Sequence, residues 1–320
     1  MKLIVQIPCF NEEQTLPETV ADIPRSIAGI SAVEILVIDD GSTDQTVQVA
    51  RDAGVDHIIQ NRCNMGLARS FQKGLDACLQ RGADIIVNTD GDNQYCGADI
   101  PKLIAPILEG RADLVIGNRQ TDSIPHFSAN KKRLQKLGSF IVRRVSGTEV
   151  ADAVSGFRAM TRETALRLNV VSSFSYTIET VIQAGKKNIA IASVPVRTNP
   201  KTRESRLYKG LPRFLERSVT TMVRIYTMYQ PLRFFSYLGL ICIGTGLIPS
   251  VRFLFYYLAG QGEGHVQSLI LAAILFIMGF QFLVAAMITD VVSRNRQLLE
   301  ETLMRVRRME IDRGKDHNGQ

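Results

Sequence analysis

The stretch DIIVNTDGDNQY, residues 84–95, decides the fold class of this 320-residue chain. Its first half is an apolar run of strand length, and its second half places two carboxylates and an amide in a turn. Asp-Gly is a common turn signal, so an ordinary polar turn is one interpretation. The other is a site for a hard metal ion, because carboxylate and amide oxygens are its preferred ligands.

The same pattern of a strand followed by a polar loop recurs through the first part of the chain. Further strands are predicted at 3–7, 34–39, 57–60 and 113–117, with helical segments between them, most clearly over 66–82. Alternation of strands and helices predicts an α/β fold with a mainly parallel sheet and helices on both faces. Ligands of such sheets bind beyond the carboxyl ends of the strands.

Distinctive polar residues stand where four of these strands end. They are Asn11 and Glu12 after the first strand, Asp39, Asp40 and Ser42 after the second, Asp90, Asp92 and Gln94 after the fourth, and Asn118 and Arg119 after the fifth. A parallel sheet would bring them to one edge, so we expect them to converge on one cleft. A helix-capping turn is the alternative interpretation of Asp39 and Asp40, and a favourable first-turn charge is that of Glu12.

Two long apolar segments follow the α/β part. Residues 234–259 contain one charged residue, Arg252, and residues 266–289 contain none. Each exceeds the roughly 20 residues that a helix needs to cross a bilayer. We therefore predict a transmembrane helical hairpin, with two unusually apolar core helices as the alternative. Arg252 is expected to extend toward the far interface, as long basic side chains do near helix ends.

Basic residues flank this hairpin and are absent from its tip, GQGEGH. The positive-inside rule then predicts two spans in the plasma membrane, with the α/β part and both termini in the cytoplasm. Apolar residues at helical spacing among basic ones predict amphipathic helices in the membrane surface, with a plain linker helix as the alternative. The expected organisation is an α/β domain at 1–206, interfacial helices at 207–232, the hairpin within 233–290, and a basic amphipathic helix with a disordered tail at 291–320.

Composition narrows the partners. The net charge of +7 fits contact with anionic lipid or phosphorylated substrates, and no RNA- or DNA-binding motif supports nucleic acid as a partner. Five scattered cysteines without a C-x-x-C pair argue against a zinc knuckle or a disulfide framework. The N-terminal MKLIVQIP predicts a first core strand and not a signal peptide. An apolar hairpin also allows self-association, so a homo-oligomer is left open.

Six segments, in their order and spacing, carry a resemblance to a known family: PCFNEEQTL, VIDDGSTDQT, NMGLARSFQKGL, DGDNQ, GNR and DAVSGFRAM. Over residues 1–206 the chain resembles family 2 glycosyltransferases of the GT-A fold, and most of all the polyprenyl-phosphate glycosyltransferases that include dolichyl-phosphate mannose synthase. Its two-helix C-terminal part is similar to the membrane-anchored bacterial members. The resemblance implies inverting transfer of a sugar from a nucleotide-diphosphate sugar, UDP or GDP, to a polyprenyl phosphate, with Mg²⁺ or Mn²⁺.

The resemblance also implies roles for individual residues. The nucleotide sugar would contact Pro8, Phe10, Asn11, Glu12, Asp40, Ser42, Asp90, Gly91 and Arg119. Asp92 and Gln94 would bind the metal, with Asp90 supporting the donor ribose or the water shell of the metal. A divalent cation held by oxygen ligands neutralises the charge that grows on a diphosphate leaving group.

Asp92 and Asp152 are the expected catalytic residues, Asp92 through the metal and Asp152 as a candidate base. A phosphate monoester has a second pKa of about 6 and is largely ionised at neutral pH, so the acceptor needs positioning more than deprotonation. Asp152 could therefore orient its loop or bind the donor sugar instead.

The segment 199–210 supplies cations for a lipid phosphate. Lys201, Arg203, Ser205 and Arg206 are expected to bind the acceptor phosphate. Ser205-Arg206 matches a Ser-Lys pair of the family, with Arg able to grip phosphate through two hydrogen bonds, while Lys201 and Arg203 compete for an upstream Arg position. A basic face that only adheres to the membrane is the alternative. Transfer to another lipid, a catalytically idle membrane adaptor and nucleotidyl transfer remain as rival functions.

Overall fold

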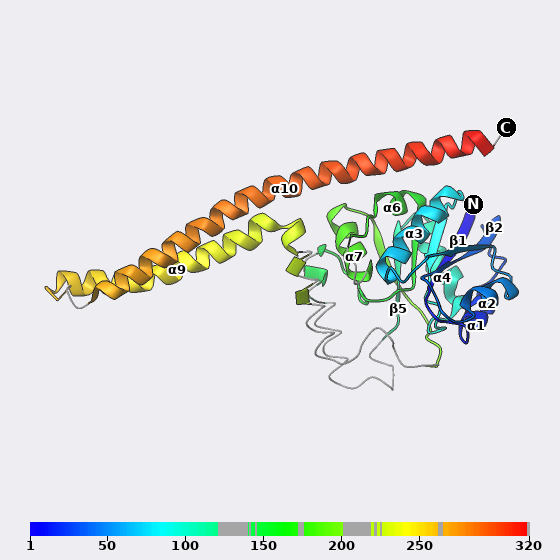
Figure 1. Cartoon of the computed structure of the whole chain (residues 1–320), viewed down its shortest axis with the longest axis horizontal. Coiled ribbons are helices and arrows are strands. Elements are labelled where there is room, and N and C mark those ends of the chain that lie inside the picture. The colour runs from blue at the N-terminus through cyan, green and yellow to red at the C-terminus, as the bar shows by residue number, and fades with distance from the viewer. Residues whose placement is uncertain are drawn as a thin grey trace. The chain divides into compact units, whose positions relative to one another are not determined.

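The computed structural model describes residues 1–120, 140, 142–144, 146–171, 176–200, 219–220, 223–224, 226–261 and 265–318. The chain divides into two compact units. The first comprises Met1–Met222 with Leu303–Gln320, and the second comprises Val223–Thr302. Figure 1 shows the sheet of the first unit and the long helices that make up most of the second unit.

A seven-stranded sheet forms the centre of the first unit (Figure 1). In sheet order its strands are β3 (His57–Gln60), β2 (Ala32–Asp39), β1 (Lys2–Cys9), β4 (Ile85–Asn88), β6 (Arg158–Thr161), β5 (Leu114–Asn118) and β7 (Ile191–Pro195). The pairs β1–β2, β1–β4, β2–β3 and β5–β7 are parallel, whereas β6 runs antiparallel to both β4 and β5. The predicted α/β class with a mainly parallel sheet is confirmed.

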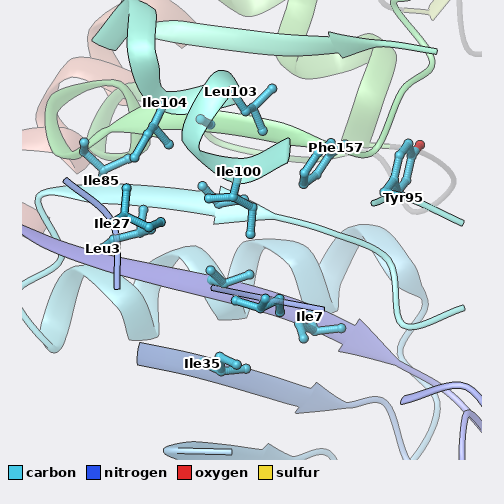
Figure 2. Packing of buried hydrophobic residues seen from close by; sticks show 14 of the residues in the cluster. Leu3, Ile7, Ile27, Ile35, Ile85, Tyr95, Ile100, Leu103, Ile104 and Phe157 are labelled. Carbon is cyan, nitrogen blue, oxygen red and sulfur yellow. The ribbon is translucent and has the colours of Figure 1, made fainter. Parts of the chain in front are cut away.

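Helices cover both faces of this sheet. They are α1 (Leu16–Ala21), α2 (Thr46–Asp52), α3 (Leu67–Gln80), the 3-10 helix η1 (Gly97–Asp99), α4 (Ile100–Leu108), α6 (Arg162–Arg167) and α7 (Tyr176–Lys186). Alternate residues of β1 point to opposite faces, and Leu3 and Ile4 are both fully buried. Leu3 and Ile7 join Ile100 and Leu103 of α4 in one continuous core cluster (Figure 2). Burial on both faces explains why the strands appear in the sequence as unbroken apolar runs.

The register of the central strands brings three loops to one edge of the sheet. Asn88 of β4 pairs with Gln6 of β1 on one side and with Arg158 of β6 on the other. The loops that follow β1 and β4 therefore leave the sheet side by side. Because β6 runs in the opposite direction, the segment that precedes it, and not the one that follows, reaches the same edge.

Two long apolar helices dominate the second unit. They are α9 (Pro231–Leu258) and the part of α10 (Val266–Asn318) up to Thr302. Both are long and apolar enough to cross a membrane, with mean hydropathies of 1.8 and 2.6 over an 18-residue window of each helix. Glycines allow close packing between them, because a methyl group at Gly239 would lie 2.9 Å from the carbonyl oxygen of Gly279.

The last helix is longer than the sequence analysis predicts. α10 continues to Asn318, where we expected a separate helix after 291 and then a disordered tail. The physical reason is that residues 290–313 contain neither Gly nor Pro, so nothing in the sequence ends the helix there. The predicted interfacial helices at 207–232 fall largely outside the described residues.

Candidate active site

The loops after β1 and β2 are bonded to each other. The backbone N–H of Asn11 donates to the hydroxyl of Ser42 at 2.9 Å, and the Asn11 side-chain oxygen accepts from the backbone N–H of Thr43 at 2.8 Å. Asn11 has a φ of 56°, a left-handed conformation that Asn adopts more readily than most residues. The N–H of Glu12 donates to the Thr46 hydroxyl at 2.8 Å. Asn11, Glu12 and Ser42 therefore lie together at the predicted edge.

The carboxylate of Asp40 organises the loop between β3 and α3. It accepts hydrogen bonds from the side chain of Asn61 at 2.9 Å and from the backbone N–H groups of Met65 and Gly66 at 2.9 and 2.8 Å. Asp40 is 4% exposed. Asp40, which we predict to contact the nucleotide, therefore also stabilises the loop between β3 and α3. Its neighbour Asp39 accepts from the N–H of Ser42 at 3.2 Å and so stabilises the turn after β2, but it does not cap α2, whose N-cap residue is Gln45.

The side chains of Asp92 and Gln94 touch in the loop after β4. The Gln94 amide nitrogen donates to Oδ2 of Asp92 at 2.7 Å, and the Gln94 backbone N–H donates to Oδ1 at 3.3 Å. Glu12 lies beside this loop, because the Thr15 hydroxyl bonds both Oε2 of Glu12, at 3.0 Å, and the carbonyl oxygen of Gly91, at 2.8 Å. The acidic loop thus meets the loop after β1.

Negative charge accumulates around Asp90. Burial, followed by repulsion from Asp92 and Glu12, raises the pKa of Asp90 to about 7, against the lowering effect of Arg119 and Arg158. The buried thiol of Cys9 is affected by the same charges. Burial first, and then Glu12 and neighbouring aspartates, raise the pKa of Cys9 well above its usual range. The edge of the sheet beyond β1 and β4 is consequently an anionic environment.

Arg119 and Asp152 form a bidentate ion pair close to this acidic group. Arg119 Nε donates to Oδ2 of Asp152 at 2.7 Å, and a terminal guanidinium nitrogen donates to Oδ1 at 3.0 Å. Asp152 is 3% exposed and the Arg119 side chain is 16% exposed. Burial lowers the pKa of Arg119, but Tyr95, Asp152 and Asp90 outweigh it and raise that pKa above its usual range. Arg119 therefore remains a cation with its charge at the anionic edge.

Arg158 shapes the segment that contains Asp152. Its guanidinium is fully buried and donates to the carbonyl oxygens of Ser155, at 2.7 Å, and Ala153, at 2.8 Å, and to the hydroxyl of Thr180. Burial lowers the pKa of Arg158, while Tyr176, Tyr95, Asp152 and Asp90 oppose that effect. The motif DAVSGFRAM leads us to expect that Ser155, Gly156 and Arg158 shape one loop, and Arg158 bonds two carbonyl groups of that loop.

The structure brings most of the predicted donor-site residues to this edge, but not all in the same way. Pro8 is buried in β1, in register with Ile38, whereas Phe10 is 36% exposed directly beyond the strand. Gly91 is buried against Cys9 and Glu12. The four predicted acceptor residues, Lys201, Arg203, Ser205 and Arg206, lie outside the described residues.

The donor atoms of the acidic loop fit Mg²⁺ or Mn²⁺. Asp92 and Gln94 lie in contact and carry a carboxylate and an amide oxygen between them, and hard cations of this kind prefer one or two carboxylates together with phosphate and water ligands. Among the described residues, no three His, Cys, Asp or Glu side chains form a cluster that could enclose an ion unaided.

Comparison with known proteins decides the family. The family described as Glycosyl transferase family 2 matches residues 4–167, which include β1, the acidic loop and the Arg119–Asp152 pair. This chain belongs to glycosyl transferase family 2. The resemblance found in the sequence is confirmed, and with it the assignment of the chain as a glycosyltransferase.

Relatives in the glycosyltransferase family extend the comparison. Glycosyltransferase AglJ of Haloferax volcanii is 28% identical over 314 residues, covering 95% of this chain and 96% of the relative. Undecaprenyl-phosphate mannosyltransferase of Micrococcus luteus is 27% identical over 207 residues, covering 61% of this chain and 83% of the relative.

A solved structure confirms the GT-A-like fold. Glucosyl-3-phosphoglycerate synthase from Mycobacterium tuberculosis, crystallised with Mn²⁺, UDP and glucosyl-3-phosphoglycerate, superposes with a TM-score of 0.54 at 19% identity. The match covers 71% of this chain and 78% of that structure. At this identity the likeness concerns the fold.

Proposed function

We propose that this glycosyltransferase is anchored in the membrane and transfers a sugar, with inversion, from a UDP- or GDP-sugar to a polyprenyl phosphate. One observation carries the proposal: the acidic loop of Asp90, Asp92 and Gln94 lies at the same sheet edge as the buried Arg119–Asp152 pair. One group suits a metal-bound diphosphate, and the other presents a fixed cation.

The donor half of the site would be built from the acidic loop. Asp92 and Gln94 would hold Mg²⁺ or Mn²⁺, and Asp90 would support the donor ribose or the water shell of the metal. When bound, the cation neutralises charge on the diphosphate leaving group. The loops of Asn11, Glu12 and Ser42 lie beside these residues and would contact the nucleotide.

Arg119 would supply a second positive charge near the donor sugar or its pyrophosphate. Asp152 holds its guanidinium in one orientation through two hydrogen bonds, so the charge is placed before the substrate arrives. Both carboxylate oxygens of Asp152 are engaged by the Arg119 guanidinium. The proposed mechanism does not require a base at this position, because an ionised phosphate acceptor is itself the nucleophile. We therefore assign Asp152 to the orientation of Arg119.

The acceptor would be a membrane lipid with a phosphate head. Two helices of membrane-spanning length and apolarity support anchoring, and relatives are named as mannosyltransferases of undecaprenyl or dolichol phosphate. Lys201, Arg203, Ser205 and Arg206 would bind the acceptor phosphate, since this basic segment precedes the hairpin in the sequence. The basic flanks favour a cytoplasmic location for the site.

The test is direct transfer by the full-length protein in lipid nanodiscs. It would be incubated with Mn²⁺, a panel of UDP- and GDP-sugars and short polyprenyl phosphates, and the glycolipid would be identified by mass spectrometry. We expect one polyprenyl-phosphate monosaccharide, with inverted anomeric configuration by NMR, and none from an Asp92→Asn variant. Transfer only to a different lipid would overturn the acceptor assignment. Absence of any nucleotide release would favour an idle adaptor.

A further inference from the structure

Both ends of the acidic loop hold the same residue, Gly156, on another segment. Asn88, at the end of β4, donates through its side-chain amide to the carbonyl oxygen of Gly156 at 2.8 Å. Tyr95, at the far end of the loop, accepts a hydrogen bond on its hydroxyl oxygen from the N–H of Gly156 at 2.9 Å. Residues 88 and 95 bracket Asp90, Asp92 and Gln94, so the loop closes on Gly156 from two sides.

Gly156 packs directly against the carboxylate of Asp90. A methyl group at this position would lie 2.8 Å from Oδ2 and 3.0 Å from Oδ1 of Asp90, closer than side chains approach one another. Only glycine therefore allows the backbone to come so near. The Gly156 peptide forms a wall that limits where the Asp90 carboxylate can lie.

The residues that hold Gly156 are themselves fixed by the core. Tyr95 is 4% exposed and its ring stacks on Phe157 with centroids 5.2 Å apart; both rings belong to the apolar cluster shown in Figure 2. Asn88 is fully buried, and its oxygen accepts from the Gln6 amide at 2.9 Å. Neither side chain can move away from Gly156 without breaking other buried contacts, which is costly in a packed interior.

The segment that contains Gly156 also contains Asp152. Arg158 bonds the carbonyls of Ala153 and Ser155 from inside, so the residues between Asp152 and Gly156 have little freedom. A displacement of Gly156 would therefore be transmitted to Asp152, and from there to Arg119. The acidic loop and the cation are connected through one short, rigid stretch of chain.

We propose that Asn88 and Tyr95 are positioning residues, which clamp Gly156 against Asp90 and so keep the metal-binding loop in register with the Arg119–Asp152 pair. This inference rests on the proposed function and deepens it, because it names residues that act on the metal–diphosphate site without touching the substrate. Their effect should be seen in binding of the metal–nucleotide complex as well as in turnover.

The chain offers two matched variants for the test. Tyr95→Phe removes one hydroxyl that holds Gly156 and keeps the ring stacked on Phe157. Tyr176→Phe removes one hydroxyl from another buried ring in the same region, 1% exposed against 4% for Tyr95; this hydroxyl accepts from Asn88 at 2.9 Å but makes no hydrogen bond to Gly156 among the contacts of the described residues. Each variant would be made in the full chain, and its folding checked by circular dichroism and thermal unfolding.

The decisive measurement is Mn²⁺ binding in the presence of UDP, by titration followed with electron paramagnetic resonance. We expect Tyr95→Phe to weaken Mn²⁺ binding about tenfold, the effect of one buried hydrogen bond, and Tyr176→Phe to change it less than about twofold. In steady-state assays, kcat should fall in Tyr95→Phe with a smaller change in the KM of the acceptor.

Two outcomes would overturn the inference. One is wild-type Mn²⁺ binding by a folded Tyr95→Phe variant, and the other is an equal loss in both variants, which would indicate a general loosening of the core. Failure of the proposed function would look different, because the wild-type protein would then transfer no sugar. The binding titration would still compare the two variants in that case.

Discussion

Arg119 and Asp152, 33 residues apart in the chain, meet in a two-hydrogen-bond ion pair at the edge of the sheet beyond β1 and β4. The acid is almost completely buried, and the arginine side chain is partly buried, with 16% of it exposed. Removal of either partner would leave the other as an uncompensated charge, and a lone buried charge is far more costly than a paired one. This relationship decides which experiments can separate a catalytic base from an orienting residue.

Asp152→Asn should lower kcat strongly without changing the shape of the pH–rate profile. The amide can still donate and accept hydrogen bonds, but it no longer neutralises or orients Arg119, and removal of one buried partner costs about 3 kcal/mol or more. Arg119→Gln should have a similar effect, and the double variant should be much less impaired than the sum of the two. Steady-state kinetics from about pH 5 to about pH 8, the range in which proteins are commonly most stable, checks all three.

If Asp152 were a general base, the same variants would behave differently. In that case the acidic limb of the wild-type profile would be absent in Asp152→Asn, while Arg119→Gln would retain it. The two single losses would also add. Observation of that pattern would show that Asp152 acts as the general base.

Asp92→Asn should abolish metal-dependent turnover. One fewer carboxylate on the ion removes stabilisation worth several kcal/mol, or a rate loss of about 100-fold or more. The neighbouring variant Asn93→Gly is the control, because Asn93 has a φ of 54° that glycine adopts without strain. Nucleotide release measured before and after chelation, and after addition of Mn²⁺, compares the two. Full activity in chelator would contradict metal dependence.

Asp40→Asn should destabilise the protein as well as impair donor binding. Its carboxylate accepts from three donors in the loop before α3, and an amide must turn its NH₂ group toward at least one of them. The expected loss is about 2 kcal/mol, the cost of a buried donor left unsatisfied. Urea unfolding measures it, and UDP titration measures binding. A residue that served only the nucleotide would weaken binding at unchanged stability.

The Asp99–Arg197 pair should make stability depend on pH in the acid range. Burial alone would raise the pKa of Asp99, but hydrogen bonds from Arg197 and Lys102 lower it from 3.8 to about 2. A carboxyl with a depressed pKa in the folded state stabilises the protein above its unfolded pKa, and this stabilisation is lost as pH falls from about 4 to about 2.

Arg197→Gln should therefore lower the stability at neutral pH only modestly, because the arginine side chain is 64% exposed and its charge is screened by solvent. The difference from wild type should shrink towards pH 2, as measured by urea unfolding at several pH values. Arg111→Gln, which removes an exposed partner of Glu109, is the control and should change stability little. A loss in Arg197→Gln that is constant with pH would contradict the assignment.

The sequence predicts the parallel half of the sheet well, because its strands are runs of Ile, Val and Leu with polar loops at their ends. The strand at 84–89 is predicted and β4 is observed at Ile85–Asn88. β6 is different: its sequence, RAMT, has no strand signature, and its place is set by pairing with β4 and β5. Long-range pairing of this kind is invisible to local pattern.

In the candidate site, too, the sequence predicts some features, whereas others depend on contacts between distant residues. Motif order identifies Asp92, Gln94, Arg119 and Asp152, but only the folded chain shows that Arg119 and Asp152 bond to each other. Asn88 and Tyr95 are missed because each has an ordinary local explanation, as a strand end and as a core aromatic. An Asn in a fully buried strand is nevertheless a signal, since a buried amide must find partners.

The reversed direction of β6 has a consequence for how such chains can diversify. Loops on the donor side follow their strands, whereas the stretch with Asp152 and Gly156 precedes its strand and is anchored at its downstream end by Arg158. Insertions upstream of Asp152 can thus lengthen the chain between β5 and β6 without shifting the register of β1, β2 or β4. Natural variation in the substrate accepted could then accumulate in a segment that leaves nucleotide recognition unchanged.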